Sequence, residues 1–423
     1  MSKKNIEKMH KEYSKPQLSR WQKQKKRQRI ILWSGVGLIA LVVLGLVGVY
    51  IWQEVAPLYR TVISVNGQKI TMNDYIKVLR TTLQGETEED LFYSAYYTGS
   101  ALIESEIIEQ GAAALNIAVT DEEVETYLSD YGLDKGRTPI VRSQLLITKL
   151  LDEYFKPQVP ATAEQRNIEA MFLENEVQAG EIRAEIEAGA SFADLAAEYS
   201  LDDYTKTNNG SVGMHPQEIL TYLLGSTVPG DYAFASEAGS LSQPRPDSEK
   251  KKAEGYWLIQ VIEKGTGDYE GQINVRVMLL SSEGEAQSIR EQLVQITDPV
   301  QRNEEFANIA DEQSQYDTGG KNGGLVGFIG QDVFSDVFDE AAFNLEVGEI
   351  SQPVKDTSQT TTGGAWLVKV IEAATDAEVT VEDTNILANG LYSMWYTLAE
   401  GSAEIQSPTS EDIMFALGKI IGS

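Results

Sequence analysis

The chain repeats itself, and this duplication constrains its fold more than any other feature of the sequence. FADLAAEYS, which begins at Phe192, returns as FANIADEQS at Phe306, an offset of 114 residues. FASEAGSLSQP, from Phe234, returns as FNLEVGEISQP from Phe343, an offset of 109. Matching order with changing spacers is typical of a duplicated domain whose loops differ in length. We therefore expect two similar domains, each with a first strand, helices, a glycine-rich turn and closing strands.

Each copy ends on a strand that carries a tryptophan at the same place. Trp257 lies in GYWLIQVIEK and Trp366 in GGAWLVKVIE, again 109 residues apart. Apolar side chains alternate along both strands, which predicts one buried face. The tryptophans either fill core volume or form an apolar platform for a bound chain. We expect the two domains at 160–264 and 272–373, joined by the polar link GTGDYEGQ.

Composition excludes several classes of function. The chain has no cysteine and two histidines, His10 and His215, which argues against thiol catalysis, histidine metal sites and a Ser-His-Asp triad. We expect no metal and no cofactor, and His215 is expected as an exposed loop residue. The net charge is −29, yet residues 1–29 carry +9, so the remainder carries −38. A body this acidic repels phosphates, and no nucleic-acid partner is expected.

An uncharged segment follows the basic tail. Residues 30–52 read IILWSGVGLIALVVLGLVGVYIW, and 23 uncharged, mostly apolar residues suffice to span a bilayer as a helix. Trp33 and Trp52 lie near its two ends, where aromatic rings favour the membrane interface. The basic tail predicts a cytoplasmic N-terminus, a single-pass anchor in the cell membrane and an extracytoplasmic body. A cleaved signal peptide is the alternative.

Helical patterns dominate residues 60–156 and 378–423. In the first range, Asn66-Gly67 between apolar runs predicts a hairpin, and Thr71 and Thr120 are typical helix caps. In the second range, Trp395 belongs to an apolar helical patch that must be buried elsewhere.

The second copy resembles the parvulin-type peptidyl-prolyl isomerase domain. The segments that carry this resemblance are FANIADEQS, GGLVGF, FDEAAFNLEVGEISQPV and AWLVKV. The order of parts is similar to that of the SurA and PrsA group of extracytoplasmic foldases. The resemblance implies an α+β protein: a transmembrane helix, two parvulin-like βα3βαβ2 domains and a helical chaperone module. In that group, the N-terminal part and the C-terminal helix together form this module.

The resemblance also implies site residues. Parvulins usually carry one histidine on the first strand and another on the last. The equivalent positions here are Met171 and Met278 on the first strands, and Trp257 and Trp366 on the last. The acidic catalytic position corresponds to Asp317 in the second copy and to Asp202 or Asp203 in the first, of which we select Asp203. The proline pocket corresponds to Phe334 and Phe338, whose spacing of four places both rings on one helical face.

Each of these residues also has a purely structural interpretation. An aspartate in a polar loop commonly forms a turn, and two phenylalanines on one helical face commonly pack in a core. The leading functional interpretation is a membrane-anchored foldase. It binds unfolded, newly secreted polypeptides and their proline-containing segments, and isomerase activity is weak or lost. The alternatives are an active isomerase that works mainly through the second domain, and a scaffold for another envelope complex.

Overall fold

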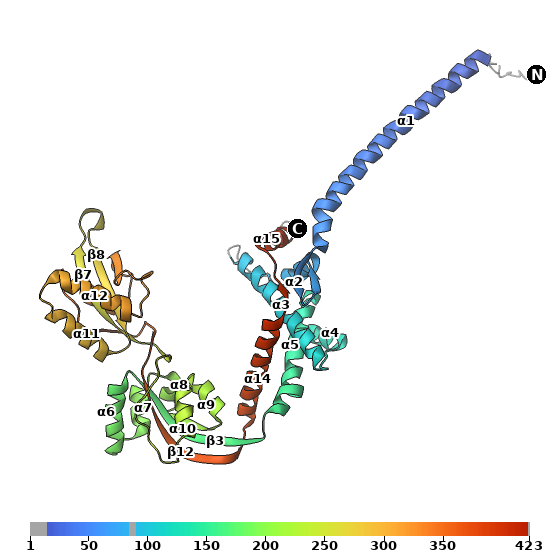
Figure 1. Ribbon diagram of the computed structural model, residues 1–423. Coiled ribbons are helices and arrows are strands. Elements are labelled where there is room, and N and C mark those ends of the chain that lie inside the picture. The colour runs from blue at the N-terminus through green and yellow to red at the C-terminus, as the bar shows by residue number, and fades with distance from the viewer. Residues whose placement is uncertain (1–14, 84–89, 422–423) are drawn as a thin grey trace, which may run out of the picture. The chain divides into compact units, whose positions relative to one another are not determined.

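The computed structural model describes residues 15–83 and 90–421. The chain divides into two compact units. The first comprises Met1–Phe155 and Leu391–Ser423, and the second comprises Lys156–Gly390 (Figure 1). The predicted α+β class is confirmed, since both units combine helices with antiparallel sheets.

A long helix opens the described part of the chain. Helix α1 (Lys15–Tyr50) continues through η1 (Ile51–Val55) and η2 (Ala56–Tyr59). By length and composition, Lys25–Tyr59 could cross a membrane, and no second helix among the described residues meets that test. A signal sequence meets the same criterion.

The predicted hairpin begins the first unit. Strands β1 (Thr61–Val65) and β2 (Gln68–Thr71) pair antiparallel around Asn66 and Gly67. The turn residues have φ of 51° and 84°, the left-handed values that a tight two-residue hairpin requires. The helices that follow are α2 (Met72–Thr82), α3 (Leu91–Ala114), α4 (Asp121–Asp130), η3 (Lys135–Arg137), α5 (Thr138–Lys149), η4 (Leu150–Phe155) and, at the start of the second unit, η5 (Lys156–Gln158).

Both predicted helix caps form. The Thr71 side chain accepts a hydrogen bond from the Asp74 backbone N–H at 3.3 Å and so begins α2. At α4, Thr120 and Glu123 form the full reciprocal capping box. Each cap satisfies backbone donors that a helix start leaves without partners.

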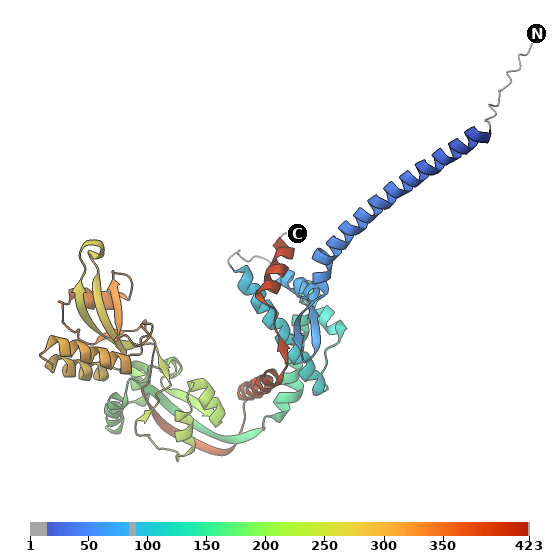
Figure 2. The same cartoon turned by 45° about the horizontal axis from the view of Figure 1, so that its top comes forward.

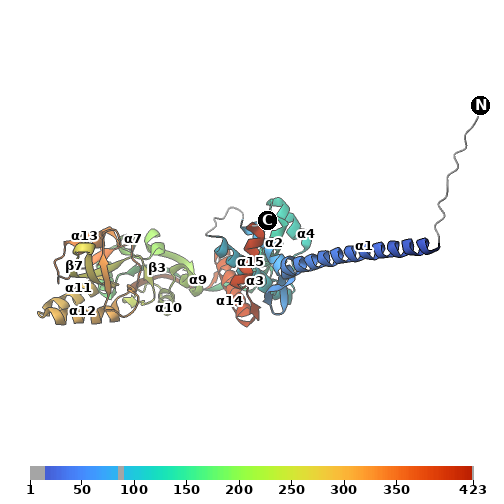
Figure 3. The same ribbon diagram turned by 90° about the horizontal axis from the view of Figure 1, so that it is seen from above.

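The C-terminal segment completes the first unit, as the resemblance implied. Strand β13 (Ile405–Gln406) pairs with β1 and extends the hairpin to three strands. Helix α15 (Ser410–Ile421) lies beside α2 and α3, and buries Ile413, Ala416 and Leu417 in their core (Figure 3). Trp395 on α14 (Val381–Ser402) packs against Phe155 at 5.9 Å between ring centroids. Met394 and Leu398 on the same helix stay exposed, so the predicted burial of this apolar patch is correct only in part.

The second unit contains two four-stranded antiparallel sheets of matching topology. The first sheet has the order β4-β3-β12-β5, with β3 (Thr162–Leu173), β4 (Ser211–His215), β5 (Arg245–Pro246) and β12 (Ala365–Glu378). The second has the order β10-β7-β8-β9, with β7 (Gly255–Lys264), β8 (Ile273–Leu280), β9 (Leu325–Ile329) and β10 (Val354–Asp356). A short ribbon of β6 (Lys251–Lys252) and β11 (Thr361–Thr362) accompanies them.

The closing strands are exchanged between the repeats. Strand β12, from the second repeat, pairs with β3 of the first, and the two lie side by side in Figures 1 and 2. Strand β7, from the first repeat, pairs with β8 of the second. The expected ranges 160–264 and 272–373 therefore do not coincide with the two sheets. Periodicity indicates which face of a strand is buried, but not which of two similar sheets the strand joins.

Helices cover both faces of each sheet. In the first sheet, α6 (Glu176–Glu187) and α7 (Phe192–Tyr199) pack on one face, and α9 (Gln217–Leu224) and α10 (Val228–Phe234) on the other. In the second sheet, α11 (Glu283–Gln295) and α12 (Pro299–Gln313) pack on one face, and α13 (Asp336–Asn344) on the other. Two short elements complete the unit, α8 (Asp203–Thr207) and η6 (Gly267–Tyr269).

Candidate functional site

The two tryptophans occupy equivalent places in the two sheets. Trp366 opposes Phe172 across the β12–β3 ladder, and Trp257 opposes Leu279 across the β7–β8 ladder. Both indole side chains are fully buried. This burial favours the structural interpretation of these residues, in which the rings fill core volume between strand and helix.

Each indole N–H is satisfied by an aspartate of the other repeat. Trp366 Nε1 donates to Asp247 Oδ2 and Trp257 Nε1 donates to Asp356 Oδ2, both at 3.0 Å. The two aspartates are 109 residues apart, the same offset as the tryptophans. A buried indole donor needs such a partner, so the pair fixes the ring orientation in both sheets.

In the second sheet the tryptophan belongs to an aromatic cluster. Its ring contacts Tyr316, Phe334 and Phe338, with centroids 4.9, 5.6 and 5.3 Å away. The rings of Phe334 and Phe338 stack at 4.2 Å and 17°. Phe338 is fully buried, whereas Phe334 and Tyr316 are only partly buried. The cluster therefore offers two partly exposed aromatic rings backed by a rigid core.

Asp356 connects the indole to the helix that carries Phe338. Besides Trp257, it accepts hydrogen bonds from Ser335 Oγ at 2.6 Å and from the backbone N–H and Oγ of Ser358 at 2.9 and 2.7 Å. Ser335 in turn caps α13 by accepting from the Phe338 N–H. Burial opposes the charge on Asp356, but the hydrogen bonds from Ser335, Ser358 and Trp257 outweigh it and lower the pKa of this carboxyl.

A pocket of about 280 Å³ opens beside Tyr316. The segment from Ser314 to Gly324 forms much of its wall, and Asp317 and Lys321 contribute polar groups. Asp317 is exposed, and its Oδ1 accepts a hydrogen bond from the Gly319 N–H at 2.8 Å, as a turn-forming aspartate does. The structure thus brings Asp317 to the same side of the domain as Tyr316, in the role of a loop residue.

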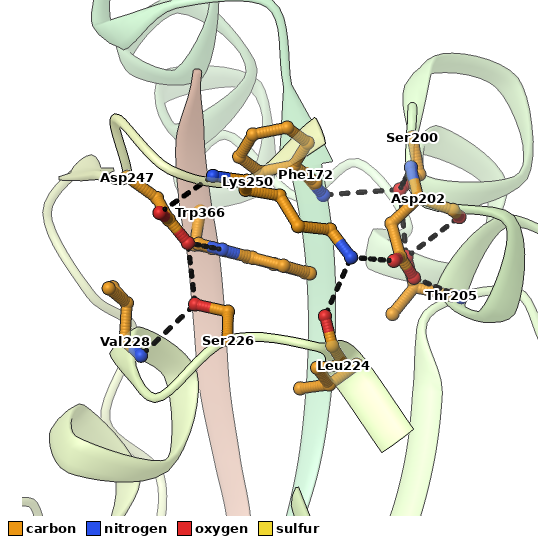
Figure 4. A network of polar contacts seen from close by, with 10 residues as sticks. All are labelled: Phe172, Ser200, Asp202, Thr205, Leu224, Ser226, Val228, Asp247, Lys250 and Trp366. Carbon is orange, nitrogen blue, oxygen red and sulfur yellow. Dashed lines mark hydrogen bonds and ion pairs between the residues drawn. The ribbon is translucent and has the colours of Figure 1, made fainter. Parts of the chain in front are cut away.

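In the first sheet, a lysine covers the surface that corresponds to the aromatic cluster of the second sheet (Figure 4). Lys250 Nζ lies 5.5 Å from the Trp366 ring centroid and donates to Asp202 Oδ2 at 2.7 Å and to the Leu224 carbonyl at 2.6 Å. Asp202 is buried, whereas its neighbour Asp203, the residue we selected, is exposed in the first turn of α8. The first sheet therefore offers no open aromatic surface at Trp366.

Two other predicted positions lie away from the tryptophans. Met171 is buried beneath α6 and α7, and Met278 beneath α11 and α12, each on the opposite sheet face from the indole. The residues that face the indoles are Phe172 and Leu279, one position later. A shift of one residue in a strand reverses the face, and an alignment of short motifs does not resolve such a shift.

The aromatic cluster around Phe334 also differs from the sequence-based prediction in its members. Phe334 belongs to the second repeat, but the strand exchange places Trp257 of the first repeat beside it, rather than Trp366. Tyr316 completes the cluster, and sequence reasoning did not select it, because it lies in an irregular loop without periodicity. The helical spacing did predict the contact of Phe334 with Phe338, although Phe334 precedes α13 rather than lying within it.

His215 is not the exposed loop residue that we expected. It lies on β4, 21% exposed at the side chain, with Nδ1 3.0 Å from both carboxylate oxygens of the buried Asp383 and Nε2 3.1 Å from the Val212 carbonyl oxygen. The ring therefore lies between the Asp383 carboxylate and a backbone carbonyl oxygen, and both of these groups are hydrogen-bond acceptors. Among the residues that the structure describes, no group of three or more acidic or histidine side chains could hold a metal ion.

Known families match most of the chain. The PPIC-type PPIase domain matches residues 158–263 and 273–372, and the SurA-like N-terminal domain matches residues 20–132. Foldase protein PrsA of Caldanaerobacter subterraneus is 29% identical over 233 residues, which cover 46% of this chain and 71% of the relative. Chaperone SurA of Chromohalobacter salexigens is 24% identical over 255 residues, which cover 59% of this chain and 53% of the relative.

Two solved structures are also similar to this chain. Foldase protein PrsA from Streptococcus pneumoniae is 12% identical, covering 86% of this chain and 93% of that one, with a TM-score of 0.26. PrsA from Bacillus anthracis is 11% identical, covering 81% and 94%, with a TM-score of 0.20. These scores are low, and the assignment rests on the sequence matches. With two PPIC-type PPIase domains behind a SurA-like N-terminal domain, the chain belongs to the parvulin-type peptidyl-prolyl isomerase family and is similar to PrsA foldases and SurA chaperones.

Proposed function

We propose that the protein is a membrane-anchored foldase that holds unfolded secreted polypeptides outside the cell membrane, with binding dominating over prolyl isomerisation. The observation that carries this proposal is the asymmetry between the two sheets. The second sheet presents the partly exposed rings of Phe334 and Tyr316, whereas Lys250 closes the corresponding surface of the first. One open aromatic site suits weak contact with proline-containing segments of varied sequence.

The residues around the site favour binding over catalysis. Rotation about a prolyl bond has a barrier of about 20 kcal/mol, so a catalyst must stabilise the twisted amide more than the planar one. The facing positions on the first and last strands, where the resemblance implies a histidine pair, hold Phe172 with Trp366 and Leu279 with Trp257. All four side chains are apolar and buried, so they supply no polar group to a bound amide. Aromatic rings bury a proline ring well, but they stabilise planar and twisted amides to a similar extent.

The experiment compares Phe334→Ala with Val333→Ala in the full chain in detergent. Val333 is exposed beside Phe334 but belongs to no ring contact, so it is the matched control. We expect Phe334→Ala to weaken suppression of aggregation of an unfolded, proline-rich client several-fold, and Val333→Ala to leave it unchanged. Exchange of a prolyl peptide, followed by NMR, should be slow with either chain. Fast exchange that Phe334→Ala abolishes would instead support the active isomerase.

The membrane part of the proposal rests on the apolar helix. Its apolar side chains from Leu32 onward are exposed along the helix, and lysines and arginines precede them. We expect the full chain to float with lipid vesicles and to resist extraction at alkaline pH. A variant with Leu41→Arg and Leu44→Arg should be extracted, since charges at the bilayer centre cost about 3 kcal/mol each on insertion scales. Equal extraction of both chains would refute the anchor.

A further inference from the structure

The two closing strands, β7 and β12, pair with their sheets in the same register. Trp366 opposes Phe172 and Trp257 opposes Leu279, so the ladders have the same register. The bulge in β12, between Val370 and Glu372, recurs at the same offset of 109 in β7, between Val261 and Glu263. The Trp–Asp hydrogen bonds follow the same offset. By backbone geometry alone, each strand could equally close the sheet of its own repeat.

The side chains break this symmetry by charge. Lys369 on β12 opposes Glu169 on β3, with an Nζ–Oε2 distance of 2.9 Å. At the matching place in the other ladder, the neutral Gln260 opposes Arg276. If each strand returned to its own repeat, Lys369 would face Arg276 and Glu169 would face Gln260. Like charges directly across a ladder destabilise it, so the charges favour the exchanged pairing.

Side-chain volume favours the same pairing. On β12 the small Ala365 opposes Leu173, whereas on β7 the large Tyr256 opposes Leu280 and is buried in the core beneath α11. Returning the strands would bring Tyr256 into a core that fits an alanine, and would leave Ala365 where a phenol ring is needed. Both an overfilled core and a cavity are unfavourable.

The two chain segments that connect the sheets also pair with each other. Strands β6 and β11 pair antiparallel, and both Lys252 and Thr361 are buried there. Lys252 Nζ donates to the Glu174 carbonyl at 3.0 Å, and Thr361 Oγ1 donates to the Glu254 carbonyl at 2.6 Å. The ribbon therefore joins the end of the first sheet to the start of the second.

We propose that the sequence selects this strand exchange within one chain, so that the two PPIase domains are interlocked and the aromatic site takes its tryptophan from the first repeat and its phenylalanines from the second. Register and bulge make both arrangements possible. The Glu169–Lys369 pair, the position of Tyr256 and the crossing ribbon decide between them.

Engineered cysteines test the proposal, because the natural chain has none. The Asn167→Cys and Glu372→Cys pair reports the exchanged ladder, in which these two residues are partners. The Asn167→Cys and Glu263→Cys pair reports the linear arrangement, since Glu263 is the equivalent of Glu372 in the first repeat. Both pairs are treated in the full chain with a short bismaleimide and read by mass spectrometry of tryptic peptides. We expect a link in the first pair and little in the second; equal links, or a dominant 167–263 link, would overturn the proposal.

A swap of two residues then tests the charge argument. Gln260→Lys combined with Lys369→Gln moves the cation to the other strand, so the linear arrangement gains the pair with Glu169. We expect the double variant to raise the yield of the 167–263 link several-fold. Lys369→Gln alone is a milder change at a partly exposed position, and we expect it to raise that yield less. An unchanged ratio in both would reject the charge pair as a determinant. Links between separately labelled single-cysteine chains, Asn167→Cys mixed with Glu372→Cys, would show exchange between copies and overturn the within-chain proposal.

Discussion

At the scale of single residues, Asp356 is the group whose charge the aromatic site depends on most directly. Its carboxylate holds the Trp257 indole and the Ser335 cap of α13 at once. Removing a charged acceptor leaves these donors in a buried place, so we expect Asp356→Asn to lower the free energy of unfolding by about 1–3 kcal/mol at pH 7. The control is Asp336→Asn on α13, where the side chain is exposed, and this change should have little effect.

The same residue gives a pH dependence of defined sign. Its pKa is lowered from an ordinary value of 3.8, so its contribution is fully present above about pH 4 and is lost as the pH falls through the folded-state value. Denaturant titrations between pH 2 and 7 should show a smaller acid loss in Asp356→Asn than in the natural chain. Parallel curves for the two chains would contradict the assigned role.

Residue patterns predicted part of this site and missed the rest for identifiable reasons. The spacing of Phe334 and Phe338 predicted their contact. The alternation around Trp257 predicted one buried face, whereas both faces of β7 are buried from Gly255 to Val261. Tyr316 lies in a loop, where no period marks the side that a ring will face. The choice between Met278 and Leu279 depended on a single-residue register that only strand pairing reveals.

At the scale of elements, the contact of α3 with α14 depends on a missing side chain. A Cβ at Gly111 would lie 2.4 Å from the Trp395 ring, so we expect Gly111→Ala to displace that ring and lower the free energy of unfolding by about 1–3 kcal/mol. Gly390 on α14 has open space around it, and Gly390→Ala should stabilise the helix by up to about 1 kcal/mol. Thermal unfolding followed by circular dichroism measures both, and equal effects would contradict the packing role of Gly111.

Elements with local signals follow directly from the sequence. The Asn66-Gly67 turn, the Thr120 capping box and the need to bury Trp395 were all evident before the structure, because each depends on neighbouring residues or on one helical face. The destination of β7 and β12 was not evident. The two repeats resemble each other so closely there that pattern alone favours the shorter, linear connection.

At the scale of the whole molecule, strand exchange predicts shared stability. Each sheet of the second unit contains a strand that the chain reaches only by crossing to the other sheet, so neither sheet can lose its closing strand without disturbing its neighbour.

Leu220 is fully buried in the core of the first sheet, and Leu220→Ala should lower the free energy of unfolding by about 2–5 kcal/mol. We expect hydrogen-exchange protection to fall by a similar free energy in β3 and in β8. Leu102→Ala, in the core of the first unit, is the matched control and should leave β8 unchanged. Loss of protection confined to β3 would mean that the two sheets open independently, as two linear domains would.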